Sequence, residues 1–116
     1  MAPEILLIDD DALASSLRKR VLERNGYRVQ LALDAASGIA LADVLRPSLI
    51  IMDHQLPDLI GPMLLQRLRE VRPGTPILVH SGYESLRDQY PTPPTAFLTK
   101  GDGVENMLAA ISRQLP

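Results

Sequence analysis

The sequence of 116 residues contains no cysteine and no tryptophan, and its aromatic side chains are one phenylalanine and three tyrosines. Without cysteine, the chain forms neither disulfides nor thiolate metal sites, and thiol redox chemistry is excluded. With so few aromatic rings, a stacking platform for nucleobases or for a flavin ring is hard to build. These shortages argue against redox and base-stacking functions.

Strong net charge and long apolar runs are also lacking. The formal net charge is −2, and the longest run of basic residues is Arg18-Lys19-Arg20, whereas proteins that bind nucleic acid present a basic face. No basic start precedes an apolar stretch as long as a signal peptide or a membrane span. We therefore expect a cytoplasmic domain without membrane association and without direct nucleic-acid binding.

Apolar residues make up 46% of the chain, enough to bury one core. They gather in short runs that alternate with segments of helical periodicity. One strand is expected at 27–31, and four further runs are apolar throughout: residues 5–8, 49–52, 77–79 and 96–98. Such strands are covered on both faces, as in a parallel sheet between helix layers. We predict an α/β fold, a doubly wound five-stranded parallel sheet with helices on both faces, formed by residues 1–116 as a single domain.

The helical segments show periodicity and starting signals. Leu13, Leu17 and Val21 recur at helical spacing, with the charged residues of that segment mostly on the other side, which predicts the apolar face of the first helix. Asp11 and Asp34 directly precede helical segments, and we expect both to act as N-caps.

Polar residues stand where the predicted strands end. Asp9 and Asp10 follow the first strand, Asp53 ends the third, Ser81 the fourth, and Lys100 follows the fifth. In doubly wound sheets the functional sites lie beyond the carboxyl ends of the strands, so these side chains are expected to converge.

Three converging carboxylates need compensation, because each pair at roughly 4 Å and an effective dielectric near 20 repels by about 4 kcal/mol. Either one carboxyl takes a proton or a cation lies among them. Oxygen ligands without His or Cys suit Mg²⁺ or Ca²⁺, and few carboxylates with open positions favour Mg²⁺. A carboxylate can also act as a nucleophile and form an acyl phosphate. In that chemistry Lys100 supplies a cation and the Ser81 hydroxyl a hydrogen-bond donor.

Four sequence blocks resemble the conserved blocks of response-regulator receiver domains of two-component signalling: "ILLIDDD", "LIIMDHQLPDLIG", "ILVHSG" and "FLTKG". The resemblance implies a flavodoxin-like sheet of strand order 2-1-3-4-5. It implies Asp53 as the phosphoacceptor, with a phospho-histidine of a histidine kinase or a histidine phosphotransfer protein as donor. It further implies a downstream protein partner, and a domain that catalyses only its own phosphorylation and dephosphorylation.

The resemblance also implies how a metal is held. Asp10 and Asp53 are the implied direct Mg²⁺ ligands, the Gln55 backbone carbonyl is a third, and Asp9 acts largely through water. Gln55 is expected near the mouth of the site together with Tyr83, whose ring we expect to shield the acyl phosphate from water.

Three further positions match the family's switch. Ser81 and Lys100 match its switch hydroxyl and its phosphate-binding lysine, and Phe97 matches the aromatic residue that swings inward after phosphorylation. A plain core position is the other interpretation of Phe97. His54 and His80 are isolated in the sequence, and we expect both to be structural.

The sequence departs from the family at two places. Gly101 follows Lys100 where the family usually has proline after a cis bond. Because a non-proline cis bond costs about 2.5–4 kcal/mol, we predict a trans Lys100–Gly101 bond. Between Ser81 and the last strand, the segment 84–95 leaves room for only about two helical turns before Pro91 stops them. A shortened fourth helix is therefore expected.

The same residues bear on three rival functions. A flavodoxin-type protein needs a phosphate-binding loop rich in Ser, Thr and Gly after the first strand, where this chain has aspartates. A haloacid-dehalogenase-type phosphatase needs an acid two residues after the nucleophile, where this chain has Gln55. A receiver-like adaptor that is not phosphorylated stays open as the alternative. So does the choice between a stand-alone receiver and a piece of a longer protein.

Overall fold

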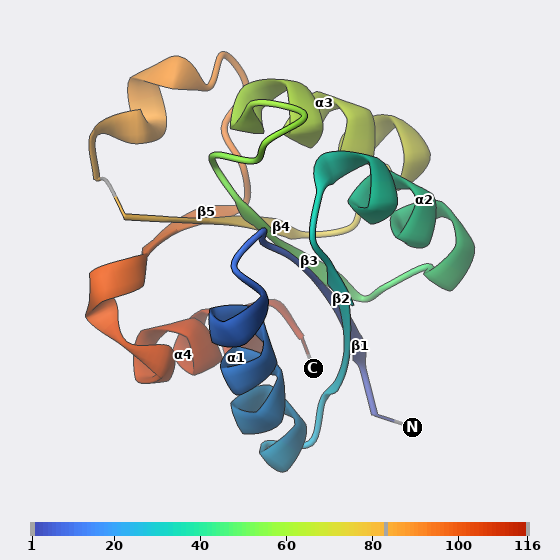
Figure 1. Ribbon diagram of the computed structural model, residues 1–116, viewed down its shortest axis with the longest axis vertical. Helices are drawn as coiled ribbons and strands as arrows, with labels where there is room; N and C mark the ends of the chain where they lie inside the picture. Colours follow the sequence, from blue (N-terminus) through green and yellow to red (C-terminus); the bar gives the residue numbers. More distant parts are fainter. Residues whose placement is uncertain (1, 83, 116) are drawn as a thin grey trace.

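The computed structural model describes residues 2–82 and 84–115, and its centre is a sheet of five parallel strands (Figure 1). The strands are β1 (Glu4–Ile8), β2 (Arg28–Ala32), β3 (Leu49–Asp53), β4 (Ile77–Ser81) and β5 (Ala96–Thr99). Their order is β2-β1-β3-β4-β5, and all four pairings are parallel. The predicted fold class and strand order are confirmed.

Helices cover both faces of the sheet (Figure 1). One layer holds α1 (Ala12–Arg24) and α4 (Val104–Gln114), and the opposite layer holds α2 (Ala35–Leu45) and α3 (Gly61–Val71). None of the helices in the part of the chain that the structure describes has the length and hydrophobicity needed to cross a bilayer.

Two apolar clusters, one on each face, explain why the strands are apolar throughout. Every residue of β3 and β4 is buried, and alternate side chains point to opposite faces. Towards α2 and α3 the sheet presents Leu6, Ile8, Ile50, Met52, Ile77 and Val79. Towards α1 and α4 it presents Ile5, Leu7, Leu49, Ile51 and Leu78. A rigid sheet buried on both faces therefore supports the polar edge where the strands end.

Carboxylates fix the starts of two helices. The Asp11 side chain accepts a hydrogen bond from the Ala14 amide at 3.0 Å, and the Asp34 side chain accepts one from the Ser37 amide at 2.7 Å. Both predicted N-caps are confirmed. A contact that the sequence did not reveal comes from Asp58, which accepts from two amides at the start of α2 and ties the loop after β3 to that helix.

The predicted apolar face of α1 is wrong. Leu13 is 74% exposed and Leu17 is 54% exposed, whereas Ser15 and Leu22 are buried. Ser15, Arg18 and Leu22 are spaced three and four residues apart, so they share one face. That face turns towards the sheet, where Leu22 packs in the apolar cluster with Ile5 and Leu7 and Arg18 reaches a buried carboxylate at the sheet edge.

The buried hydroxyl of Ser15 leads to a stability prediction. It has no hydrogen-bond partner among the residues that the structure describes, and an unsatisfied buried polar group is unfavourable. We expect Ser15→Ala to raise the free energy of unfolding by about 1 kcal/mol beyond the gain in helix propensity. Chemical denaturation measures this, and Ser16→Ala on the exposed side of the same turn reports propensity alone. Equal effects of the two substitutions would contradict the interpretation.

The helix expected between β4 and β5 is short, as the sequence predicts. In its place stands η1 (Glu84–Gln89), a 3-10 helix of six residues, and Pro91 follows after the buried Tyr90. A second 3-10 turn, η2 (Lys100–Asp102), joins β5 to the last helix. No cis peptide bond occurs within residues 2–82 and 84–115, so the predicted trans Lys100–Gly101 bond is confirmed.

Candidate functional site

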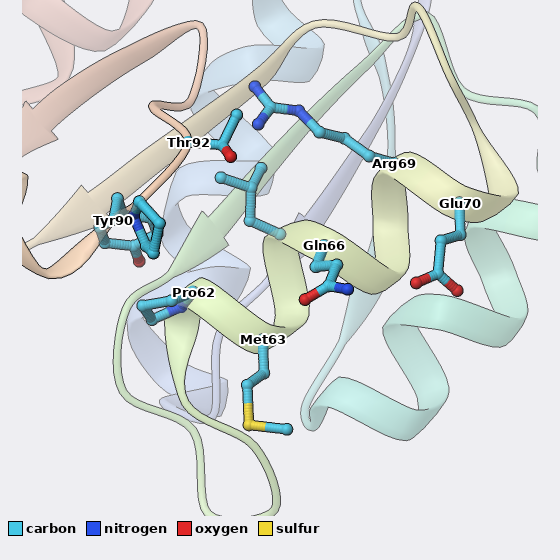
Figure 2. Close-up of a pocket in the computed structure, with 9 residues that line it drawn as sticks. Pro62, Met63, Gln66, Arg69, Glu70, Tyr90 and Thr92 are labelled. Atoms are coloured by element: carbon cyan, nitrogen blue, oxygen red, sulfur yellow. The ribbon is translucent and has the colours of Figure 1, made fainter.

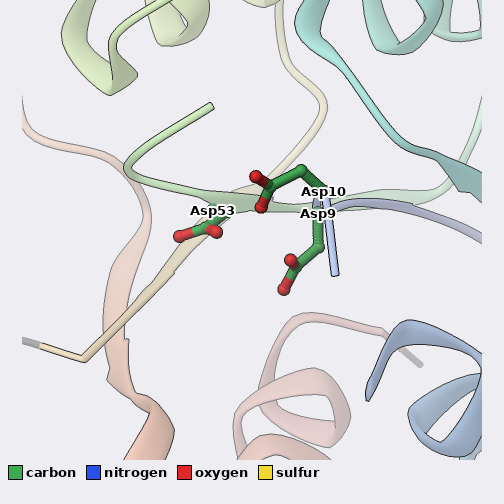
Figure 3. Close-up of side chains that lie close together, drawn as sticks. All are labelled: Asp9, Asp10 and Asp53. Atoms are coloured by element: carbon green, nitrogen blue, oxygen red, sulfur yellow. The ribbon is translucent and has the colours of Figure 1, made fainter. Parts of the chain in front are cut away.

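Three carboxylates meet at the carboxyl edge of the sheet. Asp9 and Asp10 follow β1 and Asp53 ends β3, and these strands are neighbours in the sheet. One oxygen from each side chain lies within 4.8 Å of the other two, and Figure 3 shows the three side chains grouped at this edge. Asp9 and Asp53 are buried, whereas Asp10 is exposed. The predicted convergence of the acids is confirmed.

Two cations contact the acids. The Lys100 ammonium lies 3.2 Å from Asp53 Oδ2 and 3.3 Å from Asp9 Oδ2, so it bridges two carboxylates. The Arg18 guanidinium lies 3.2 Å from the same Asp9 oxygen. Lys100 stands where the sequence placed it, whereas Arg18 belongs to the charged residues that the leucine spacing predicts mostly on the side away from the apolar face, and in the structure it reaches the buried Asp9. Ser15, Arg18 and Leu22 share one face of α1, but two of these three residues are polar, so no hydrophobic periodicity in the sequence marks that face.

Burial and charge set the protonation of the site. Burial raises the pKa of Asp53, the Lys100 charge lowers it and the Asp9 charge raises it, with a net upward shift. Burial, reinforced by the Arg18 and Lys100 charges, lowers the pKa of His80 to about 4, so its imidazole is neutral. Lys100 thus offsets only part of the unfavourable burial of Asp53, which leaves the cluster suited to a further cation.

An open cavity of about 660 Å³ lies in front of the acids. Its lining includes Asp10, Asp53, Gln55, Ser81 and Lys100. Ser81 is buried at the end of β4. Gln55 is exposed, and its backbone amide donates to Asp53 Oδ1 over 3.4 Å. The fold thus brings these predicted site residues to one cavity, whereas the predicted shielding residue Tyr83 lies outside the described residues.

Phe97 is linked to the residue beside Asp53 through Tyr90, a residue that the sequence did not single out. The Phe97 ring meets the Tyr90 ring edge-on, with centroids 5.3 Å apart, and the Arg87 guanidinium lies 5.2 Å from the Phe97 centroid. The Tyr90 hydroxyl is 2.8 Å from His54 Nδ1. A continuous set of contacts therefore joins β5 to the loop that follows β3.

Gly61 makes room for this Tyr90 contact. A Cβ atom at position 61 would collide with the Tyr90 hydroxyl and stand 2.9 Å from the His54 carbonyl oxygen. We expect Gly61→Ala to lower the free energy of unfolding by about 2 kcal/mol, because the buried ring has to move. Gly101→Ala is the matched control, since a Cβ there meets nothing within 4 Å. Equal denaturation midpoints for the two variants would show that Tyr90 does not need this space.

A second cavity, of about 490 Å³, lies between α3 and residues 90–92. Figure 2 shows Tyr90 and Thr92 on one side and Met63 and Gln66 of α3 on the other. It is separate from the acids and shares Tyr90 with the Phe97 contacts.

Comparison with known proteins agrees with this geometry. Residues 5–112 match the response regulator receiver domain family. Over 114 residues the chain is 40% identical to the DNA-binding dual master transcriptional regulator RpaA of Synechocystis sp., covering 94% of this chain and 47% of RpaA. It is 30% identical over 110 residues to the transcriptional regulatory protein TrcR of Mycobacterium tuberculosis, covering 92% of this chain and 43% of TrcR. The chain thus spans less than half the length of these curated relatives.

Solved structures share the whole fold. A CheY-like response regulator receiver domain protein from Methanospirillum hungatei superposes with a TM-score of 0.91 at 29% identity, covering 98% of this chain and 94% of that one. The receiver domain of the hybrid histidine kinase CckA superposes with a TM-score of 0.83 at 27% identity, covering 97% and 99%. The chain belongs to the family of response regulator receiver domains of two-component signalling.

Proposed function

We propose that Asp53 is the residue of this receiver domain that accepts the phosphoryl group, and that residues 1–116 act as one phosphorylation-dependent switch. The observation that carries the proposal is the meeting of three carboxylates within 4.8 Å, with Lys100 held against Asp53 at 3.2 Å. Asp53 faces the open cavity, whereas Asp9 is buried behind it.

The donor set fits Mg²⁺. All ligand atoms of the cluster are carboxylate oxygens, which suits a hard cation that keeps several of its waters. Asp10, Asp53 and the Gln55 carbonyl are the proposed direct ligands, and the buried Asp9 acts through water. When bound, the ion supplies positive charge for the phosphoryl oxygens.

The chain's own groups supply the rest of the transfer. An Asp53 carboxylate oxygen forms the new bond to phosphorus while the bond from phosphorus to the donor nitrogen of a phospho-histidine breaks. The Lys100 ammonium neutralises charge on the transferred group, and the Ser81 hydroxyl donates a hydrogen bond to it. Beyond this transfer and the later hydrolysis, no further reaction is proposed.

The switch follows from the added charge. An acyl phosphate brings nearly two negative charges to a cavity lined by Lys100 and Ser81. Both are drawn towards it, and Phe97, which packs on Tyr90, follows by moving inward. The contacts of Phe97 with Tyr90 and Arg87 change as a result, and so does the surface around Arg87.

The proposed partners are those of a two-component receiver. The donor is a histidine kinase or a histidine phosphotransfer protein, and the recipient of the signal is a further protein. RpaA and TrcR are named as transcriptional regulators, and the chain matches less than half of each, so DNA binding is not proposed for this domain. A cytoplasmic location agrees with these partners.

Dependence on a divalent ion tests the proposal. With acetyl phosphate and Mg²⁺, we expect the intact mass of the chain to rise by one phosphoryl group, because the metal offsets the repulsion between the acids and the incoming phosphate. With EDTA in place of Mg²⁺, we expect the rate of this gain to fall at least about a hundredfold. Equal rates in the two conditions would contradict the assigned metal site.

A further inference from the structure

Asp9 uses both of its oxygens on groups of the protein itself. Oδ1 accepts from the Asp11 amide at 2.9 Å. Oδ2 lies 3.2 Å from the Arg18 guanidinium and 3.3 Å from the Lys100 ammonium. The carboxylate is only 1% exposed, and a buried charge of this kind needs partners. Arg18 is therefore a principal counter-ion of this acid.

The charges at the cluster show that Arg18 and a divalent ion oppose each other. The three carboxylates carry three negative charges, and Arg18 and Lys100 together carry two positive ones. A divalent ion added to this set turns a net charge of −1 into +1. Lys100 also contacts Asp53, whereas Arg18 contacts Asp9 alone among the three acids. Arg18 is thus the cation that binding of the metal repels and that the phosphoryl chemistry does not require.

Arg18 also has space into which it can withdraw. A cavity of about 230 Å³ on its side of the sheet is lined by Arg18, His80, Lys100, Val104 and Met107, among others. His80 is 5% exposed, and its Nδ1 has no hydrogen-bond partner among residues 2–82 and 84–115. The neutral imidazole of His80 has one acceptor nitrogen, and the Arg18 guanidinium only donates hydrogen bonds. The two groups that line this cavity are therefore complementary.

We propose that Arg18 is a built-in competitor of the divalent cation, which holds Asp9 while the metal is absent and gives it up when the metal binds. This inference rests on the metal site of the proposed function. In the metal-free domain Arg18 thereby adds a second counter-ion to the buried Asp9 carboxylate, beside Lys100, and the affinity for the metal is weaker than the three acids alone would provide. Arg18 is a positioning residue, because it acts on the metal site only through Asp9.

The test compares the Mg²⁺ affinity of Arg18→Met with that of the unchanged chain, followed by the backbone amide NMR signals of the cluster. Removal of one repelling unit charge is expected to tighten binding about tenfold. Arg28→Met is the matched control, since Arg28 also pairs with a carboxylate, Glu4 at 3.4 Å. That pair lies where β1 and β2 begin, at the far edge of the sheet, so its loss is expected to leave the affinity unchanged. The Mg²⁺ affinity of Arg18→Lys is expected to lie between the affinities of Arg18→Met and the unchanged chain.

Thermal melting provides a readout that needs no phosphorylation. Without metal, Arg18→Met is expected to melt below the unchanged chain, because Asp9 loses a partner. The rise in melting temperature on adding Mg²⁺ is then expected to be larger in the variant. In the unchanged chain, the guanidinium NMR signal of Arg18 is expected to move as Mg²⁺ is added, which tests the idea even if the variant folds poorly.

The outcomes separate this inference from the proposed function. Equal or weaker Mg²⁺ binding by a folded Arg18→Met would overturn the role of Arg18 and leave the metal site intact. An Arg18 signal that stays fixed while the cluster signals move would do the same. If the unchanged chain bound no Mg²⁺ at all, the metal site itself would be wrong.

Discussion

Asp53→Asn is expected to gain no phosphoryl mass from acetyl phosphate and Mg²⁺ under conditions in which the unchanged chain is fully modified. The amide oxygen is a poor nucleophile, and loss of the reacting group removes the chemistry itself rather than one contribution to it. The measurement is the intact mass of each protein over time.

Asp34→Asn provides the control for Asp53→Asn. It makes the same chemical change at the same edge of the sheet, and asparagine caps a helix about as well as aspartate, so the Ser37 contact of α2 is retained. We expect its phosphorylation to match that of the unchanged chain. A full phosphoryl gain by Asp53→Asn would contradict the assignment of the acceptor.

Asp53→Asn is also expected to stabilise the metal-free fold at neutral pH. Because burial raises the pKa of Asp53 in the folded state, the Asp53 carboxyl group holds its proton more tightly in the folded chain than in the unfolded chain. The free energy of unfolding therefore falls as the pH rises from 3.8, the ordinary pKa of an aspartate, through the higher pKa of Asp53 in the folded state. Asparagine carries no charge and avoids that loss, so the melting temperature of Asp53→Asn at pH 7 is expected to exceed that of the unchanged chain. Added Mg²⁺ is expected to narrow the difference.

Lys100→Met is expected to slow phosphorylation from acetyl phosphate by roughly a hundredfold or more, as loss of a positioned charge at a developing anion does. The ammonium contacts both buried acids, at 3.2 Å and 3.3 Å, so the substitution leaves Asp53 without its cation. Methionine keeps much of the length and the apolar stem of the side chain. The initial rate of phosphoryl gain, at saturating Mg²⁺, measures the effect.

The chain has one other lysine, Lys19, and Lys19→Met is the natural comparison for Lys100→Met. Lys19 forms no ion pair with any residue in the described part of the chain, and its replacement is expected to leave the rate unchanged. Lys100→Arg separates charge from placement: the charge stays, but the planar guanidinium cannot occupy the position of the ammonium. A normal rate in Lys100→Met would show that charge at this position does not assist the transfer.

The sheet was predictable from the sequence because strands that are buried on both faces are apolar at every position. The runs at 49–52 and 77–79 are apolar at every position, and they lie in the central strands β3 and β4. The meeting of Asp9, Asp10 and Asp53 followed in turn, since parallel strands end at one edge.

Contacts that depend on the orientation of a helix or the path of a loop were not predictable in this way. In α1 the pattern of Leu13, Leu17 and Val21 suggested the wrong face, because the face towards the sheet carries the polar pair Ser15 and Arg18. An arginine that pairs with a buried acid nine residues earlier leaves no periodic signal.

Tyr90 was missed for a related reason. It follows η1 in a segment rich in proline that reads as a surface loop, yet its side chain is 5% exposed. Its place is set by the Gly61 backbone, the His54 ring and the Phe97 ring, which are far from it in sequence or on other elements. Only the fold brings these groups together.

The most direct test of the central claim is to find which residue carries the phosphoryl group. Sodium borohydride reduces an acyl phosphate on aspartate to homoserine, so the phosphorylated chain can be reduced, digested and sequenced by mass spectrometry. Homoserine at position 53, absent when acetyl phosphate or Mg²⁺ is omitted, is the predicted result. Homoserine at position 9 or 10 in place of position 53 would contradict the account. So would the absence of homoserine from every aspartate position of a chain that was fully phosphorylated before reduction.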